Sequence, residues 1–345
     1  MRTQKNKNTN RLISIGIAAL VLAPLSWALI LLIRGMLQWS HSDNEPLAQS
    51  SHLASFNKVP DVPAGLFSYG GSPAWAGIRR LADSAISSER PEFQFRYVQP
   101  ISAPAESGIG IQMLLDGQLS FAQTSRPLLQ AEYRLAQERG FKLEQIPVAV
   151  DAIAFVVHPS LEIVSVSLEH LRQIYSGKIL NWKKLGGPNV DIIPLSRRKS
   201  TDGTVSFFTQ NIIDSKQLGS NVKFVSTTTE ALRLLASTPG GIYFDSASTV
   251  LTQCSSKPLT ISRDTKQLIS PYEGILVPSA DCPKRRNRLN IGAFQTGRYP
   301  ITRYLYVVIK KNNRLEEKAG QAYANFLLTD QGQTLISKAG FVRIH

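Results

Sequence analysis

The stretch Ser196-Arg-Arg-Lys-Ser-Thr-Asp-Gly-Thr-Val-Ser-Phe-Phe208 places three cations and several hydroxyls between two apolar segments. The preceding run, 190–195, predicts a strand, and the apolar spacing over 205–212 predicts a helix after the loop. The first turn of a helix exposes N–H groups without partners and carries partial positive charge, so arginine and hydroxyl donors beside it favour an anion site. An ordinary surface turn, with Thr201 or Asp202 as N-cap and a solvated basic cluster, is the alternative interpretation.

Similar junctions recur along the chain, where alternating strand and helix patterns predict an α/β architecture with mainly parallel sheets. The apolar runs Leu143–Ala149 and Ile153–Val157 predict two strands, and the second is typical of a buried parallel strand. Ligands of such sheets lie at the carboxyl ends of strands, where helix N-termini point. Four expected strand-to-helix junctions carry Gly, Ser, Thr or Arg: Gly71-Ser72, Ser107-Gly108, Ser125-Arg126, and 198–204. Together they predict a shared anion site.

The length of the chain predicts two lobes, and its charge predicts an anionic partner. The 345 residues are 43% hydrophobic and 19% charged, an ordinary globular composition with material for more than one core. The net charge is +14, but five basic residues and no acid lie in the first 34 positions. The remainder holds 34 basic and 25 acidic residues, a balance of +9 that favours anionic partners.

The N-terminal segment predicts a membrane anchor. Leu12 to Ile33 are 22 consecutive residues without a charge, long enough as a helix to span a bilayer, and basic residues precede them. We therefore expect a cytoplasmic end and signal-anchor over 1–34, a tether over 35–61, and a body on the periplasmic or extracytoplasmic face. Cleavage of a signal peptide near Ala23–Ala28, or later, is the alternative.

The two cysteines and the scattered histidines do not indicate catalysis or a metal. In an exported protein Cys254 and Cys282 predict a disulfide, with a pair of buried free thiols as the alternative. Two cysteines without neighbouring histidines make a poor metal site, and we expect no cofactor. The sequence contains no Gly-x-Ser-x-Gly or His-Glu-x-x-His motif, so we expect no catalytic residues and no enzyme.

Several ordered motifs resemble those of one known family, the extracytoplasmic phosphate-binding proteins that feed the phosphate ABC importer. The motifs are Gly70-Gly-Ser-Pro73, Ser107-Gly-Ile-Gly-Ile111, Gln123-Thr-Ser-Arg-Pro-Leu128, 146–159, 167–182 and 299–306. The resemblance implies a two-lobe, type II periplasmic-binding-protein-like fold whose lobes close over the ligand. It also implies inorganic phosphate as the ligand and a phosphate ABC permease as the partner. By this pattern lobe 1 is 62–150 plus 299–345, and lobe 2 is 151–298.

The resemblance also implies a set of ligand residues. They are Gly71, Ser72, Ser107, Gly108, Ser125, Arg126, Arg198, Asp202, Gly203 and Thr204. The usual family motif is Arg-x-x-Gly-Ser-Gly-Thr, whereas here Thr201 replaces a Gly and Asp202 replaces the Ser. Some members carry an Asp that accepts the proton of hydrogen phosphate and rejects sulfate, at a junction where this chain has Arg126. Asp202 either supplies that acceptor or caps the helix.

Two other functions stay open at this point. The altered loop is consistent with a membrane-tethered sensor or scaffold that does not transport phosphate, or with a binder of another oxyanion. The basic run Lys284–Arg288 is either a solvated loop or a surface that docks onto anionic headgroups or the importer. Export argues against nucleic acid as a partner.

Overall fold

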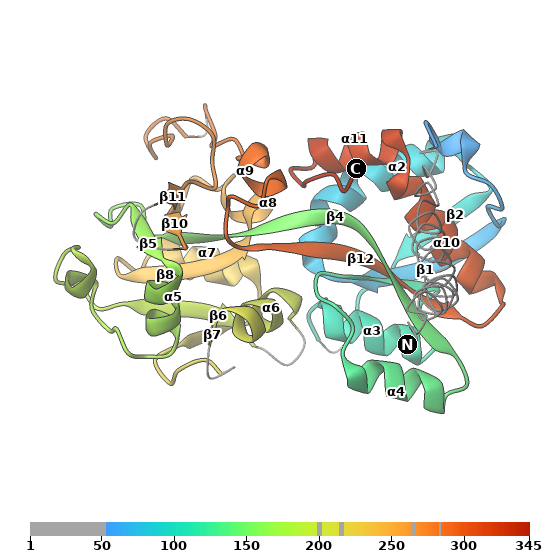
Figure 1. The fold of residues 1–345 in the computed structure, drawn as a ribbon, viewed down its shortest axis with the longest axis horizontal. Helices are drawn as coiled ribbons and strands as arrows, with labels where there is room; N and C mark the ends of the chain where they lie inside the picture. The colour runs from blue at the N-terminus through green and yellow to red at the C-terminus, as the bar shows by residue number, and fades with distance from the viewer. Residues whose placement is uncertain (1–52, 102, 199–201, 214–216, 264–266, 283) are drawn as a thin grey trace, which may run out of the picture. The chain divides into compact units, whose positions relative to one another are not determined.

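The computed structural model describes residues 53–101, 103–198, 202–213, 217–263, 267–282 and 284–345, which belong to one compact unit. Among these residues no helix is both long enough and apolar enough to cross a bilayer. The anchor expected over Leu12–Ile33 lies outside the described residues. In Figure 1 the unit has two halves, each with its own sheet segment and covering helices.

Two long strands run from one half to the other (Figure 1). β4 (Lys142–Val157) is one continuous strand of 16 residues, and β12 (Thr302–Lys311) pairs with it in antiparallel register. The expectation of two separate strands is therefore wrong. Asp151, which interrupts the apolar pattern, stays in the strand because its register partner on β12 is Arg303. The run Ile153–Val157 is buried as expected, but it pairs antiparallel with β8.

The first half contains parallel strands at whose carboxyl ends the three serine junctions lie. The sheet order is β2-β1-β3-β12-β4, with β1 parallel to both β2 and β3. The strands are β1 (Gly65–Gly71), β2 (Phe93–Tyr97) and β3 (Phe121–Thr124). The helices are η1 (Phe56–Lys58), η2 (Pro73–Trp75), α2 (Ala76–Glu89), α3 (Ser107–Leu115), α4 (Gln130–Glu138), α10 (Leu315–Leu328) and α11 (Asp330–Lys338).

The second half extends the same sheet in the order β4-β8-β6-β7, with β6 parallel to β7 and β8. Its strands are β6 (Ile193–Arg197), β7 (Lys223–Val225), β8 (Gly241–Ser246), β9 (Lys257–Pro258), and a small sheet of β5 (Ser165–Ser167), β10 (Thr260–Ser262) and β11 (Leu268–Ile269). Its helices are α5 (Leu168–Tyr175), η3 (Trp182–Leu185), α6 (Gly203–Asn211), α7 (Thr228–Ala236), α8 (Ala247–Val250) and α9 (Ile291–Gln295).

Each half has its own buried core. Phe155, Phe208 and Phe244 pack together in the second half, where ring centroids lie 4.5 to 5.5 Å apart. Tyr69 and Tyr323 belong to a separate aromatic core in the first half. Two cores joined by shared strands are what a two-lobe α/β fold requires. The lobe boundaries at 150/151 and 298/299 stay predictions.

The disulfide between Cys254 and Cys282 is present, which confirms that expectation and excludes the pair of free thiols. The bond joins the segment after α8 to the segment before the basic run. Within that run Arg285 pairs with Asp281, and Arg288 pairs with Glu273. The side chains of Arg285, Arg286 and Arg288 are exposed.

Candidate functional site

Three serines from three different junctions meet in space. Ser72 follows β1, Ser125 follows β3, and Ser107 is the first residue of α3. The Ser72 Oγ donates to the Ser125 Oγ at 2.9 Å, and the Ser107 and Ser125 Oγ atoms lie 3.2 Å apart. All three side chains are at most 2% exposed. We call these residues the serine cluster. Their convergence places several hydroxyl donors at one buried point.

The fourth junction reaches the same point from the other half. Gly203 begins α6, and a Cβ atom on it would lie 2.4 Å from the Ser107 Oγ and 2.5 Å from the Ser125 Oγ. A Cβ atom at such distances would displace the serine hydroxyls, so glycine lets the N-terminus of α6 approach the serine cluster closely. Gly71 is constrained in the same way, because its φ is 122° and a Cβ there would lie 2.2 Å from the Gln123 carbonyl oxygen.

Two helix N-termini therefore face each other across the serine cluster. α3 begins at Ser107 and α6 begins at Gly203. The amides of the first turn of each helix have no intrahelical acceptor, and both dipoles direct partial positive charge to this point. Thr204 is buried at the second position of α6, whereas Gly108, in the first turn of α3, is only half-buried. The arrangement can donate several hydrogen bonds to one anion.

The arginine that reaches the site is Arg197, not the neighbouring Arg198 named from the sequence. Arg197 ends β6 and is 5% exposed. Its Nη2 lies 2.7 Å from the Asp202 Oδ2 and 3.3 Å from the Asp245 Oδ2. Arg198 is exposed, with its guanidinium carbon 5.5 Å from the centre of the Phe224 ring. Arg197 is the last residue of β6, whereas Arg198 lies beyond the end of the strand, where its side chain is exposed.

Asp202 has both carboxylate oxygens engaged. Its Oδ1 accepts from the Val205 amide at 2.7 Å, which is an N-cap bond, and its Oδ2 pairs with Arg197. The structure thus places Asp202 in the capping role that the sequence offered as one of two possibilities. The second carboxylate, Asp245, accepts from the Thr228 and Tyr243 hydroxyls at 2.6 and 2.9 Å.

Electrostatic interactions favour the ionised forms of Asp245 and Arg197. Burial raises the pKa of Asp245, but Arg197 and the bonds from Thr228 and the Ser246 amide bring that pKa below its ordinary value. Burial disfavours the charged form of Arg197, yet Asp202 and Asp245 raise its pKa above the ordinary value. We call Arg197, Asp202 and Asp245 the Arg197 cluster. It places two carboxylates on one guanidinium.

Arg126 is buried, but its guanidinium is directed to another partner. Its Nη1 and Nη2 bind the two carboxylate oxygens of Glu132 at 3.0 and 2.6 Å, and the Nη1 also donates to the Pro127 carbonyl. This bidentate pair fixes the turn after β3, next to Ser125. The structure therefore brings together the serines, Gly203, Thr204 and Asp202, and leaves Arg126 beside them and Arg198 outside.

One functional candidate that sequence reasoning missed is Glu106. It is the N-cap residue of α3, it is 4% exposed, and its charge interacts with Asp202 and Arg197. Burial, followed by Asp202, raises the pKa of this carboxyl to about 7, while Arg197 lowers it. A single acid before a Ser-Gly pair carries no periodic signal, so only its position in space identifies it.

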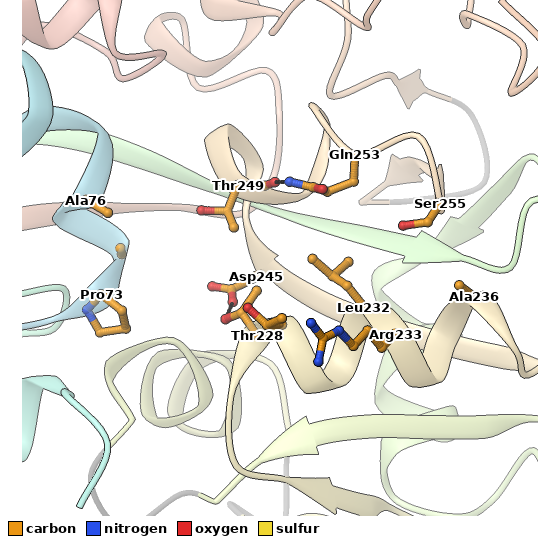
Figure 2. A pocket seen from close by; sticks show the side chains of 12 residues that line it. Pro73, Ala76, Thr228, Leu232, Arg233, Ala236, Asp245, Thr249, Gln253 and Ser255 are labelled. Atoms are coloured by element: carbon orange, nitrogen blue, oxygen red, sulfur yellow. Dashed lines mark hydrogen bonds between the residues drawn. The ribbon is translucent and has the colours of Figure 1, made fainter. Parts of the chain in front are cut away.

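A cavity of about 460 Å³ opens between the two halves and extends to the Arg197 cluster. Figure 2 shows Pro73 and Ala76 on one side of it, and Thr228, Asp245 and Thr249 on the other. Pro73 directly follows Ser72, and Asp245 contacts Arg197. The cavity is therefore a route from solvent to the edge of the site.

Comparison with known proteins identifies the family. Residues 60–331 match the family model of the PBP superfamily domain, which covers most of the chain. The chain therefore belongs to the PBP superfamily.

Curated relatives and solved structures agree with this assignment. The phosphate-binding protein PstS of Staphylococcus epidermidis is 24% identical over 70% of this chain and 69% of its own. PstS of Borreliella burgdorferi is 26% identical over 69% and 77%. A Clostridium perfringens protein, described as a phosphate ABC transporter substrate-binding protein and crystallised with bound phosphate, is similar with a TM-score of 0.64. It is 20% identical, and the match covers 81% of this chain and 100% of that one. These likenesses show a shared two-lobe α/β fold.

Proposed function

We propose that this protein captures inorganic phosphate between its two halves, on the extracytoplasmic side of a membrane, and delivers it to the permease of an ABC importer. The observation that carries the proposal is the convergence of four strand-to-helix junctions on one buried point. The relatives named for phosphate binding, and the neighbour with bound phosphate, supply the identity of the anion.

The proposed mechanism is binding without covalent chemistry. The hydroxyls of Ser72, Ser107 and Ser125, together with first-turn amides of α3 and α6, replace the hydration shell of the anion. Arg197 supplies the full positive charge, and charge-assisted hydrogen bonds to it are stronger than neutral ones. No residue needs to act as acid or nucleophile, so we propose a binding protein and not an enzyme.

Closure of the two halves is part of the same proposal. The serine cluster belongs to the first half, while Gly203 and Arg197 belong to the second. An anion that contacts both halves stabilises their closed arrangement, because its binding energy is gained only when they meet. The permease would recognise this closed form. Residues 12–33 would hold the protein at the membrane, near that partner.

Isothermal titration of the purified full chain, freed of bound anion, tests the proposal directly. Phosphate should bind at one site per chain with a micromolar or tighter Kd. Failure of the wild-type chain to bind phosphate at any pH would reject the proposal.

One observation favours a second candidate, a tethered sensor or scaffold that closes without an anion. Arg197 already contacts Asp202 and Asp245, and Arg126 is paired with Glu132. In addition, the three serine hydroxyls lie within hydrogen-bonding distance of one another. A scaffold would give no heat with phosphate, and its two halves would stay closed in anion-free buffer, as small-angle X-ray scattering would detect.

A further inference from the structure

Glu106 is a buried acid whose carboxylate is not used by the fold around it. Its side chain makes no capping bond to α3, and its Oε2 has no hydrogen-bond partner among the described residues. It directly precedes Ser107, whose hydroxyl lies in the serine cluster. A buried polar atom without a partner is costly, so a ligand that binds it would remove that cost.

The charges that face Glu106 come from the second half. Arg197 approaches from β6, and Asp202 approaches from the start of α6. Asp245 and Tyr243 in turn interact with Arg197. On its own helix, the first turn contains no acidic residue. An ionised Glu106 would thus be a third carboxylate near a guanidinium that already has two.

A bound oxyanion would make that excess of negative charge larger. Like charges held close together disfavour ionisation, so the anion and a negative Glu106 oppose each other. The pKa of about 7 in the anion-free protein is already high for a carboxyl, and an anion beside it raises it further. The carboxyl is therefore held neutral by its surroundings, and a neutral carboxyl has a hydrogen to donate.

We infer that Glu106 is protonated when the oxyanion is bound and donates a hydrogen bond from its carboxyl group to one anion oxygen. The inference rests on the proposed function, since it needs an anion at the serine cluster. No bond other than this hydrogen bond forms or breaks.

Two consequences distinguish this role from that of a carboxylate acceptor. First, the site accepts fully ionised tetrahedral oxyanions, such as sulfate, as well as hydrogen phosphate, because the protein and not the ligand supplies the hydrogen. Second, above neutral pH the protein must take up a proton in order to bind, so affinity falls as pH rises.

The test is isothermal titration of the anion-free full chain with sulfate and with phosphate, at about pH 6, 7 and 8.5. In the wild type the Kd for sulfate should rise roughly tenfold or more between pH 7 and 8.5, since most of Glu106 is then ionised. In E106Q the amide donates at every pH. Its Kd for sulfate should therefore change by less than about threefold over the same range.

E106A lacks the donor and should bind both anions more weakly than E106Q at every pH. If E106Q does not fold, the wild type alone tests the inference. Titration of the wild type with sulfate at pH 8.5, in buffers of different ionisation enthalpy, should show about one proton taken up per sulfate bound. Equal pH dependence in wild type and E106Q, or phosphate binding without sulfate binding at pH 6, would overturn the inference and leave the proposed function intact. If the wild type binds neither sulfate nor phosphate at any pH, both the inference and the proposed function are rejected.

Discussion

This protein contains two buried groups of charges, one in the crossing strands and one at the end of β6, and they differ in their balance of acids and bases. In the crossing strands, Asp151 on β4 and Arg303 on β12 form a pair of one acid and one base, each side chain 1% exposed. The Asp151 Oδ2 accepts from the Arg303 Nε and Nη2 at 3.1 and 2.9 Å, while its Oδ1 accepts from Ser246. The Arg197 cluster, with Glu106 beside it, has more acids than bases.

The difference in balance indicates different roles for the two groups, stability for the crossing-strand pair and ligand binding for the Arg197 cluster. A matched buried pair loses stability when either partner is removed, and its net charge is zero. An unbalanced cluster responds to any added charge, whether a proton or an anion. We therefore expect substitutions at the crossing strands to change stability, and substitutions at the Arg197 cluster to change binding and its pH dependence.

The largest effect is expected from D151N. It leaves the Arg303 guanidinium buried without its counter-charge, which should lower the free energy of unfolding by about 3–5 kcal/mol. Urea unfolding measures this value. D281N removes the exposed pair with Arg285 and should change stability by less than about 1 kcal/mol. Equal losses of unfolding free energy in D151N and D281N would show that the buried Asp151–Arg303 pair stabilises the fold no more than an exposed pair does.

The second effect is a contrast between adjacent arginines. R197Q should weaken phosphate binding by about 100-fold or more, roughly 2.7 kcal/mol, because the only full positive charge in contact with Asp202 and Asp245 among the described residues is lost. R198Q, at an exposed position, should stay within about threefold of wild type. Titration calorimetry of both variants decides. A stronger effect at Arg198 would return the binding role to the residue named from the sequence.

The third effect concerns the approach of α6 to the serine cluster. G203A adds a Cβ that would meet the Ser107 and Ser125 hydroxyls, so the halves should not close fully and phosphate affinity should fall about 10- to 30-fold. G292A is the control, since a Cβ there has no atom within 4 Å. Scattering curves with and without phosphate would report closure. Unchanged affinity in G203A would place the anion away from this contact.

The smallest effect is the pH dependence of stability from Glu106. Its folded pKa of about 7 lies above that of an unfolded glutamate, so the folded state binds the proton more tightly. Stability from this group is full below about pH 4 and is lost as pH rises towards 7. The wild type should lose about 1.4 kcal/mol more than E106Q between pH 6 and 8. Parallel urea unfolding curves across this range would contradict that prediction.

The sequence predicted the fold class and the meeting of the four junctions because these depend on local signals. Gly, Ser and Pro after apolar runs mark turns at helix starts, and Ser72, Ser107 and Ser125 lie at such turns. The pairing of Cys254 with Cys282 followed from their number. In each case the deciding residues are close in sequence or have no competitor.

The remainder depends on details that local patterns do not fix. The choice between Arg197 and Arg198 requires the end of β6 to within one residue, and β6 continues two residues beyond Leu195. The contact of Arg197 with Asp245 requires the sheet order β8-β6, which joins residues 48 apart. The two runs Leu143–Ala149 and Ile153–Val157 belong to one strand, in which Asp151 pairs with Arg303, a residue 152 positions away.

The position of β12 also dictates an order of assembly. β12 lies between β3 and β4, so until residues 302–311 are synthesised both of those strands have an open edge. The second half needs only the end of β4 beside β8, β6 and β7, and can complete its sheet earlier. Open edges invite pairing with other chains. During export, therefore, the strands of the first half emerge early but keep open edges until β12 emerges near the end of the chain. In that interval the first half is exposed to aggregation.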